Sequence, residues 1–226
     1  MYNCTKKEKK MRNIALTTIL LILSALMLVP SGYSEPRKEI KLVAAQTDGG
    51  LPLMKALALR KTSRSFSGKM LPDQVLSNLL WAACGINRAG EGKKTAPTAL
   101  NNQEIDIYVA LAEGLYLYNA KAHALTLIVA KDLRAMTGKQ GFAGDAPLNL
   151  IYVADLSKIK SMSDEDKALY SGADTGFISQ NVYLFCASEG LATVVRGYVD
   201  KEALAAAMNL GKDKKIMLAQ TVGYPK

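Results

Sequence analysis

Residues 60–66, Arg-Lys-Thr-Ser-Arg-Ser-Phe, combine three cations with three hydroxyl groups in one short stretch. Arg60, Lys61 and Arg64 supply the charges, and Thr62 is one of the hydroxyl residues between them. Guanidinium groups match the geometry of phosphate oxygens, and hydroxyl and backbone N–H groups complete such a site. The pattern therefore fits a phosphate-binding segment. On its own, however, so short a stretch is more often a solvated basic helix end, because cations at a helix C-terminus are favourable by themselves.

The elements around this basic segment (residues 60–66) must place its side chains. The apolar run from Leu51 to Leu59 predicts a helix that ends where the segment begins. Pro72 begins a second predicted helix, whose apolar spacing stops at Gly85. Residues 86–96 are rich in Gly and Lys and predict a loop.

The middle and end of the chain alternate between strand and helix patterns. Apolar runs rich in β-branched residues predict strands, and the segment 124–129 fits either a strand or the start of a helix. The fold class is therefore α+β. The predicted strands are 105–111, 115–118, 124–129, 148–153, 191–199 and 216–222, the predicted helices are 133–138, 164–189 and 201–208, and 142–147 is a predicted loop.

The longest predicted helix begins at Ser163, which resembles the first residue of a capping box together with the acidic residues that follow it. The helix ends at Gly190, a typical C-terminal glycine. Gly172 and Gly176 interrupt its first half. Because glycine lets another group come near the backbone, we expect a close approach at these two positions.

The first 34 residues form a predicted secretory signal. Five cations between Lys6 and Arg12 precede an apolar run of 16 residues, Ile14 to Val29, and small residues precede a cut before Glu35. The alternative is an uncleaved membrane anchor, although the run is shorter than the roughly 20 residues that a spanning helix needs. We expect Sec-type export to the periplasm or the extracellular space, with no membrane attachment after cleavage.

Removing 34 of 226 residues leaves 192, a length typical of one domain. A linker is predicted over residues 35–50 and the domain over 51–226. The leader carries five Lys or Arg and one Glu, so the net charge falls from +9 to +5. The sequence contains no long basic run with interleaved aromatic residues, so it does not indicate nucleic-acid binding. A modest positive charge does suit a phosphate-bearing ligand.

Cys84, Cys186 and His123 could carry further chemistry. Both cysteines lie in apolar helical patterns and are predicted to be buried free thiols, with a disulfide between them as the alternative. His123 is the single histidine, so a His-based metal cluster is excluded and no metal is expected. It is predicted to occupy a turn, and a role in protonating a substrate is the alternative.

Four segments, in their order along the chain, resemble the nitroreductase family of FMN-dependent flavoproteins. The resemblance covers residues 51–226 and implies a nitroreductase-like fold, with a central, mostly antiparallel sheet flanked by helices. The stretch from Glu113 to Asn119, with a nearby histidine, is most similar to the branch that contains azoline-oxidising dehydrogenases of peptide maturation. The four segments are Arg60 to Phe66, Ala96 to Gln103 (Ala-Pro-Thr-Ala-Leu-Asn-Asn-Gln), Gly172 through Gln180 and Asn181 to Leu191, and Gly223-Tyr-Pro225.

The resemblance implies a homodimer that binds FMN between its subunits. The basic segment is expected to contact the phosphate and the pyrimidine edge of the flavin, and the segment from Pro97 is expected to line the ring. Backbone N–H groups from Ala192 to Gly197 are expected near flavin N5, and the helix around Asp174, Gly176 and Gln180 is expected to come from the partner subunit. The implied cofactor-binding residues are Arg60, Lys61, Thr62, Arg64, Pro97, Thr98, Asn101, Gln103, Gln180, Val195, Gly197 and Lys226.

Three functions are open on this resemblance. The first is an exported FMN-dependent oxidoreductase that transfers hydride through flavin N5 to or from a small organic substrate, such as a nitroaromatic or a quinone. The second is a redox-inert flavin- or ligand-binding protein on the same fold, and the third is a peptide azoline dehydrogenase. No side chain is implied as a catalytic acid or base, because the cofactor carries the chemistry.

The chain departs from the family pattern in two places. Family members commonly carry a further Lys or Arg beyond the Gly-Tyr-Pro segment, and here either Lys226 makes that phosphate contact or the contact is missing. The long excursion that often covers the outer face of the flavin is also lacking, which predicts an open pocket.

Overall fold

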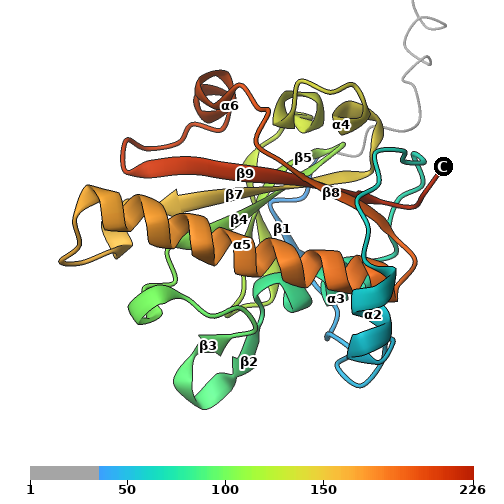
Figure 1. Cartoon of the computed structure of the whole chain (residues 1–226). Helices are drawn as coiled ribbons and strands as arrows, with labels where there is room; N and C mark the ends of the chain where they lie inside the picture. Colours follow the sequence, from blue (N-terminus) through green and yellow to red (C-terminus); the bar gives the residue numbers. More distant parts are fainter. Residues whose placement is uncertain (1–35) are drawn as a thin grey trace, which may run out of the picture. The chain divides into compact units, whose positions relative to one another are not determined.

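The structure, a computed structural model, describes residues 36–226 (Figure 1). The predicted leader, residues 1–34, lies outside the described residues, and no helix within 36–226 has the length and apolarity needed to cross a bilayer. The elements are β1 (Glu39–Lys41), α2 (Leu53–Leu59), α3 (Asp73–Cys84), β2 (Ile86–Arg88), η1 (Ala89–Glu91), β3 (Lys93–Lys94), η2 (Ala99–Asn101), β4 (Ile105–Leu111), β5 (Gly114–Asn119), β6 (Ala124–Val129), η3 (Arg134–Thr137), α4 (Phe142–Asp145), β7 (Leu148–Asp155), η4 (Leu156–Lys158), α5 (Asp164–Ser188), β8 (Ala192–Arg196), α6 (Lys201–Ala207) and β9 (Lys214–Gly223).

Seven strands form one sheet in the order β1-β6-β5-β4-β7-β9-β8, and every neighbouring pair is antiparallel. This confirms the expected antiparallel sheet. The alternating segments 105–111, 115–118 and 124–129 become β4, β5 and β6, which pair in succession. β8 is the last strand of this order and pairs with β9 on one side only. The N–H and C=O groups of its other edge can therefore bind segments outside the sheet.

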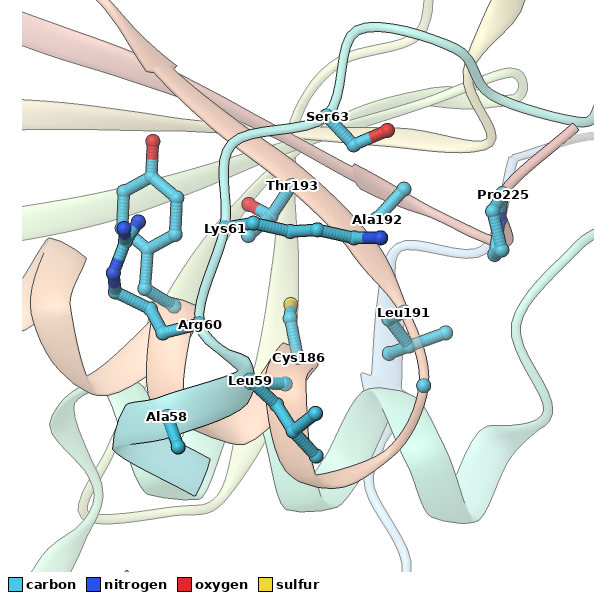
Figure 2. Close-up of a pocket in the computed structure, with 13 residues that line it drawn as sticks. Ala58, Leu59, Arg60, Lys61, Ser63, Cys186, Leu191, Ala192, Thr193 and Pro225 are labelled. Carbon is cyan, nitrogen blue, oxygen red and sulfur yellow. The ribbon is translucent and has the colours of Figure 1, made fainter. Parts of the chain in front are cut away.

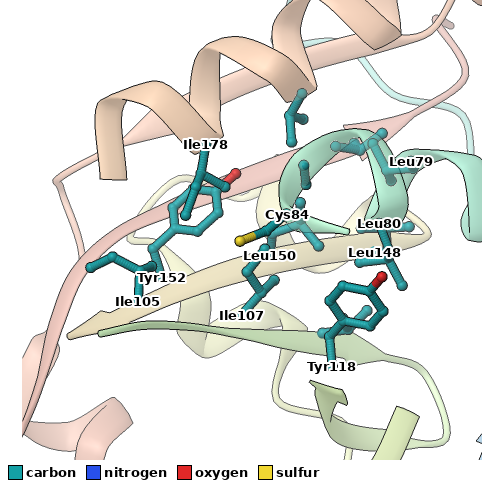
Figure 3. Close-up of a cluster of buried hydrophobic side chains, with 14 of the residues drawn as sticks. Leu79, Leu80, Cys84, Ile105, Ile107, Tyr118, Leu148, Leu150, Tyr152 and Ile178 are labelled. Atoms are coloured by element: carbon teal, nitrogen blue, oxygen red, sulfur yellow. The ribbon is translucent and has the colours of Figure 1, made fainter. Parts of the chain in front are cut away.

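Helices cover both faces of this sheet (Figure 1). The alternation along β7 shows how: Leu150 and Tyr152 join a core that includes side chains of α3 and α5 (Figure 3), whereas Ile151 and Val153 join a second core with α6. Because both faces are buried, β7 is an almost continuous apolar run, as the sequence pattern predicted.

α5 crosses one face of the sheet and is the longest helix of the described residues, with 25 residues. Ser163 caps its start, since the Ser163 hydroxyl accepts a hydrogen bond from the backbone N–H of Asp166 at 3.1 Å. Gly190 follows its end at a φ of +68°, a left-handed conformation that favours glycine. Apart from the helix's own backbone, nothing in the described residues lies within 4 Å of a Cβ built at Gly172 or Gly176, so this part of the chain does not make the expected close approach.

Several short elements differ from the sequence predictions. Residues 86–96, predicted as a loop, contain the β2–β3 hairpin, which turns through Gly92 at a φ of +63°. Residues 142–147, also predicted as a loop, begin with the single-turn helix α4, and 133–138 form a 3-10 turn rather than an α-helix. Within the predicted linker 35–50, β1 pairs with β6. The predicted strand 191–199 is shorter, since β8 ends at Arg196.

Candidate functional site

A cavity of about 530 Å³ opens where α2, the end of α5 and β8 meet (Figure 2). Two charged side chains line it, Arg60 and Lys61, and both are cations. Figure 2 shows the side chain of Lys61 extending across the hollow. With two cations and no carboxylate in its wall, the cavity suits an anionic ligand. The other lining residues are Ala58, Leu59, Ser63, Tyr183, Cys186, Ala187, Gly190, Leu191, Ala192, Thr193 and Pro225.

The basic segment is held against the sheet by its backbone. The N–H of Arg60 donates to the carbonyl of Ala56 at 2.9 Å and closes the last turn of α2, after which a ψ of 119° at Arg60 takes the chain out of the helix. Three residues later, the N–H of Ser63 donates to the carbonyl of Thr193 on β8 at 3.0 Å. The segment therefore forms part of the cavity wall rather than a freely solvated helix end.

Tyr183 of α5 joins the parts of this wall. Its side chain is 8% exposed, and its hydroxyl lies 3.1 Å from the Thr62 hydroxyl. The same phenol oxygen accepts the backbone N–H of Val195 at 3.0 Å. The guanidinium carbon of Arg60 lies 5.4 Å from the ring centroid, within the range of a cation–π contact. Sequence reasoning missed Tyr183, because a tyrosine among apolar helix residues carries no signal until β8 is placed beside it.

The outward edge of β8 presents backbone groups at every second residue. Thr193 and Val195 already have partners in Ser63 and Tyr183. Gly197 is the next outward-facing residue by the same alternation, and its N–H donates to no other residue of the segment 36–226. Of the two predicted backbone donors, Val195 is therefore occupied and Gly197 is available to a ligand.

The cavity contains no evident general base. Neither a carboxylate nor an imidazole lines it. Burial raises the pKa of the Cys186 thiol, which therefore stays protonated and is a poor nucleophile. Cys84 and Cys186 are both buried and free, as predicted. The chemistry that these walls provide is the binding and orientation of an anion.

The segment from Ala96 to Gln103 lies against the first half of α5 instead. Pro97, Thr98 and Gln103 line a small hollow of about 10 Å³ together with Asp174. The backbone N–H of Ala99 donates to the Asp174 carboxylate at 3.0 Å, which fixes the loop on the helix.

This second location is far from the cavity within one subunit. Asp174 and Tyr183 belong to the same helix and are nine residues apart in sequence. At about 1.5 Å of rise per residue, their separation along the helix axis is about 14 Å. The structure therefore brings Arg60 and Lys61 together at one place and Pro97 with its neighbours at another.

The loop at the second location has an unusual backbone. Leu100, Asn101 and Gln103 have φ values of 50°, 57° and 49°, in the left-handed region that residues other than glycine rarely adopt. The Thr98 hydroxyl accepts the N–H of Gln103 at 3.1 Å and donates to Glu104 at 3.1 Å, which holds this conformation. Strained backbone of this kind concentrates at functional sites.

Glu104 is a buried acid beside that loop. It is 1% exposed, and one of its carboxyl oxygens has no hydrogen-bond partner among residues 36–226. Burial raises its pKa, and the neighbouring Asp174 carboxylate raises it further. The folded protein therefore holds the proton of Glu104 more strongly than the unfolded chain does.

The other predicted residues line neither location. Thr62, Val195 and Gly197 lie beside the cavity wall as described above, and Arg64, Asn101, Gln180 and Lys226 are all exposed. Lys226 follows Pro225, which does line the cavity.

His123 lies in the turn between β5 and β6, as predicted. Its Nε2 lies 2.7 Å from the Ser77 hydroxyl and 3.1 Å from the Val43 carbonyl, and its Nδ1 lies 3.0 Å from the Tyr118 hydroxyl. Burial lowers its pKa. These contacts tie the segment before α2 to α3, and His123 does not line the cavity. Within 36–226, no group of three or more His, Cys, Asp or Glu side chains could hold a metal ion.

Comparisons with known proteins identify the family. The model of the Nitroreductase family matches residues 57–224. A candidate nitroreductase of Methanocaldococcus jannaschii is 31% identical over 163 residues, which are 67% of this chain and 82% of that protein. The crystal structure of a candidate nitroreductase from Ralstonia eutropha has a TM-score of 0.81 at 43% identity, over 84% of this chain and 90% of that one. The NADPH:FMN oxidoreductase from Vibrio harveyi, complexed with NAD+, shares the fold with a TM-score of 0.58 at 15% identity, over 77% of this chain and 69% of that one. The chain therefore belongs to the nitroreductase family of oxidoreductases and has the nitroreductase fold.

Proposed function

We propose that this protein is an exported, FMN-dependent oxidoreductase that transfers hydride to or from a small organic substrate, such as a nitroaromatic or a quinone. The observation that carries the proposal is the cationic cavity between the basic segment and β8. Family membership supports an oxidoreductase, and the Vibrio harveyi relative in fold is an FMN oxidoreductase by name.

The residues present fit the chemistry of FMN. Arg60 and Lys61 provide positive charge for a phosphate, and Ser63 adds a hydroxyl at the same wall. The Gly197 N–H, which has no acceptor within residues 36–226, follows β8 directly, at the position where the family resemblance implies the flavin N5. A volume of about 530 Å³ lies within the usual range of cofactor sites, roughly 300–1,000 Å³.

When bound, FMN would supply the hydride chemistry, and the residues of the chain would bind and orient it. Arg60 and Lys61 would neutralise the negative charge of the phosphate in the cavity. Tyr183 keeps the Thr62 hydroxyl next to the Val195 backbone, so the basic segment and β8 keep a fixed spacing. No carboxylate or imidazole lines the cavity, so neither type of side chain offers a proton to a substrate there.

The proposal includes a homodimer, which the two separated locations support. One subunit cannot place the segment from Pro97 at its own cavity, since both are fixed to α5 about 14 Å apart. A two-fold dimer resolves this, because each copy can offer its Pro97 segment to the cavity of the other. The exposed side chain of Leu100, at the tip of that segment, is available for such a contact.

Export is proposed on the leader sequence alone. The basic and apolar stretches of residues 1–34 favour a signal peptide, and cell fractionation with detection of the processed N-terminus tests it. A chain that stays in the cytoplasm at full length would contradict export and leave the flavin proposal standing.

The decisive experiment is an absorbance spectrum of the purified mature chain, followed by FMN titration and reduction with NADPH and with NADH. We expect a yellow protein, or one that takes up one FMN per subunit, whose flavin is bleached by a donor and restored by a nitroaromatic or a quinone. A colourless protein that ignores FMN contradicts the proposal. Bound flavin that stays oxidised with every donor supports the redox-inert alternative, and reoxidation linked to loss of hydrogen from a peptide supports the dehydrogenase.

The cationic cavity has its own test. Arg60→Ala is expected to weaken FMN binding tenfold to a hundredfold, because a lost charge-assisted hydrogen bond costs about 1.5–3 kcal/mol. Arg88→Ala is the matched control, since Arg88 is an exposed arginine that lies outside the cavity. Equal FMN affinities for the two variants would show that the phosphate is bound elsewhere.

A further inference from the structure

Arg196, the last residue of β8, is a buried cation that the cavity does not use directly. It is 5% exposed, and its guanidinium lies on the sheet face opposite α5, with its carbon 5.5 Å from the Phe142 ring centroid. Its Nη1 donates to the carbonyl of Thr137 at 2.9 Å. Its Nη2 donates to Asn149 Oδ1 at 2.8 Å and to Thr221 Oγ1 at 2.6 Å. All of these acceptors are neutral.

The positive charge of Arg196 has no compensating acid. It takes part in no salt bridge within residues 36–226, and its Nε has no hydrogen-bond partner there. Burial lowers its pKa to about 10, which leaves the group charged at neutral pH. An unpaired charge is among the costliest groups to bury. Neutral hydrogen bonds alone could have been made by an amide side chain, so the charge itself requires an explanation.

The guanidinium lies directly behind the strand that borders the cavity. Thr221 pairs with Val194 on one side and with Asn149 on the other, so the guanidinium lies along a row of residues that crosses β8, β9 and β7. Val194 is adjacent to Thr193, which lines the cavity. Strand spacings of about 3.3 Å per residue and 4.8 Å between strands place the charge within about 10 Å of that wall.

Resting on the proposed FMN site, we infer that Arg196 is the fixed charge that makes the site prefer reduced FMN to oxidised FMN. Addition of two electrons and one proton to the oxidised ring gives an anion that carries one more negative charge. A cation held in a region of low dielectric constant stabilises that extra charge and affects the neutral oxidised ring little. Contacts with the phosphate stabilise both states and leave the ratio of the two affinities unchanged, whereas the charge of Arg196 acts chiefly on the reduced state.

The test is the midpoint potential of the bound flavin, measured by equilibration with a reference dye during reduction by dithionite. Together with the potential of free FMN, this value gives the ratio of the affinities for reduced and oxidised FMN. Arg196→Met removes the charge, and we expect this ratio to fall about tenfold, the effect of one charge at about 10 Å in a partly screened interior. Arg196→Lys keeps the charge and is expected to retain most of the preference.

Thr137→Val is the matched structural control. It removes a hydroxyl that lies 3.3 Å from Arg196 Nη2 and that donates to the carbonyl of Arg134, without a change of charge. The ratio is expected to stay near that of the wild type. Two outcomes overturn the inference and assign Arg196 to packing. In the first, Arg196→Met leaves the ratio unchanged. In the second, Arg196→Lys and Thr137→Val lower the ratio as much as Arg196→Met does.

A measurement on the wild type keeps the inference testable if Arg196→Met does not fold. Because the charge favours the anion, the midpoint potential should follow pH with one proton per two electrons across the neutral range. Two protons per two electrons would mean that a neutral reduced ring is bound, which overturns the inference. A wild type that binds no FMN overturns both the inference and the proposed function, whereas bound flavin with a ratio insensitive to Arg196 overturns the inference alone.

Discussion

Tyr183 shows how much of the cavity depends on one hydroxyl group. The phenol oxygen accepts the Val195 N–H and contacts the Thr62 hydroxyl, while the ring faces the Arg60 guanidinium. Tyr183→Phe keeps the ring and leaves the Val195 N–H without its acceptor. We expect about 1 kcal/mol of lost stability and an FMN affinity weakened about fivefold, because the basic segment loses its tie to β8. Urea unfolding and FMN fluorescence titration measure the two effects.

The chain offers a matched control for that change. Tyr116 is fully buried, and its hydroxyl has no hydrogen-bond partner among residues 36–226. Tyr116→Phe removes the same group from an interior site without breaking a contact, so FMN affinity is expected to be unchanged. If Tyr183→Phe behaves like Tyr116→Phe, the phenol does not position the basic segment.

For individual residues, the sequence predicted which side chains give the cavity its charge, but it did not predict which side chains pack beside the cavity. Arg60 and Lys61 were found because cations and hydroxyls cluster locally in the sequence. Tyr183 and Arg196 were not, since their importance comes from partners on β8, β9 and η3 that no local pattern places. The resemblance predicted both Val195 and Gly197 as backbone donors. Only the structure shows that the Val195 N–H is already bonded to Tyr183, whereas the Gly197 N–H has no acceptor within residues 36–226.

Among the elements, the long periodic ones were predictable and the short ones were not. β4 has its predicted bounds, and α3 begins after Pro72 and ends before Gly85, because alternation and helix-end signals are local. The β2–β3 hairpin and α4 are short and owe their conformation to neighbours. The open space beside α5 at Gly172 and Gly176 could not be predicted either, because glycines in a sequence do not show which group packs against them.

The loop between η2 and β4 should respond to pH through Glu104. Burial raises the pKa of Glu104 in the folded protein, so the carboxyl holds its proton to higher pH than in the unfolded chain. The stabilisation that the bound proton gives is fully present below the pKa of the unfolded chain, about 4.3. It is lost as the pH rises through the pKa of the folded protein. Glu104→Gln cannot ionise. We expect it to remove this loss and to be more stable than the wild type at alkaline pH, by on the order of 1 kcal/mol.

Urea unfolding at a series of pH values measures this difference. Glu39→Gln, at an exposed position of β1, is the control and should leave the pH dependence as it is in the wild type. A wild type whose stability does not decline relative to Glu104→Gln as pH rises would mean that folding does not raise the pKa of Glu104. The buried oxygen without a partner would then need another explanation.

The whole molecule places two parts of one proposed site at opposite halves of the same helix. The cavity lies at the end of α5, the Pro97 loop is attached at Asp174 in its first half, and Phe177 lies between them on α5. Phe177 is 47% exposed, and Leu100, on the loop, is 80% exposed. Apolar side chains left exposed along this helix and loop are consistent with a second copy packing there.

Phe177→Glu tests this arrangement at the scale of the assembly. A carboxylate buried at a dimer interface costs several kcal/mol, so we expect the dimer to dissociate at least a hundredfold more readily. FMN binding should be lost in parallel, although every residue that lines the cavity is unchanged. Sedimentation velocity and FMN titration follow the two effects.

Ile128→Glu is the control. It adds the same charge to an exposed apolar position on β6, in the half of the sheet away from β8, and should change neither dimer dissociation nor FMN binding. A monomeric Phe177→Glu that binds FMN as tightly as the wild type would show that one subunit holds the whole cofactor site.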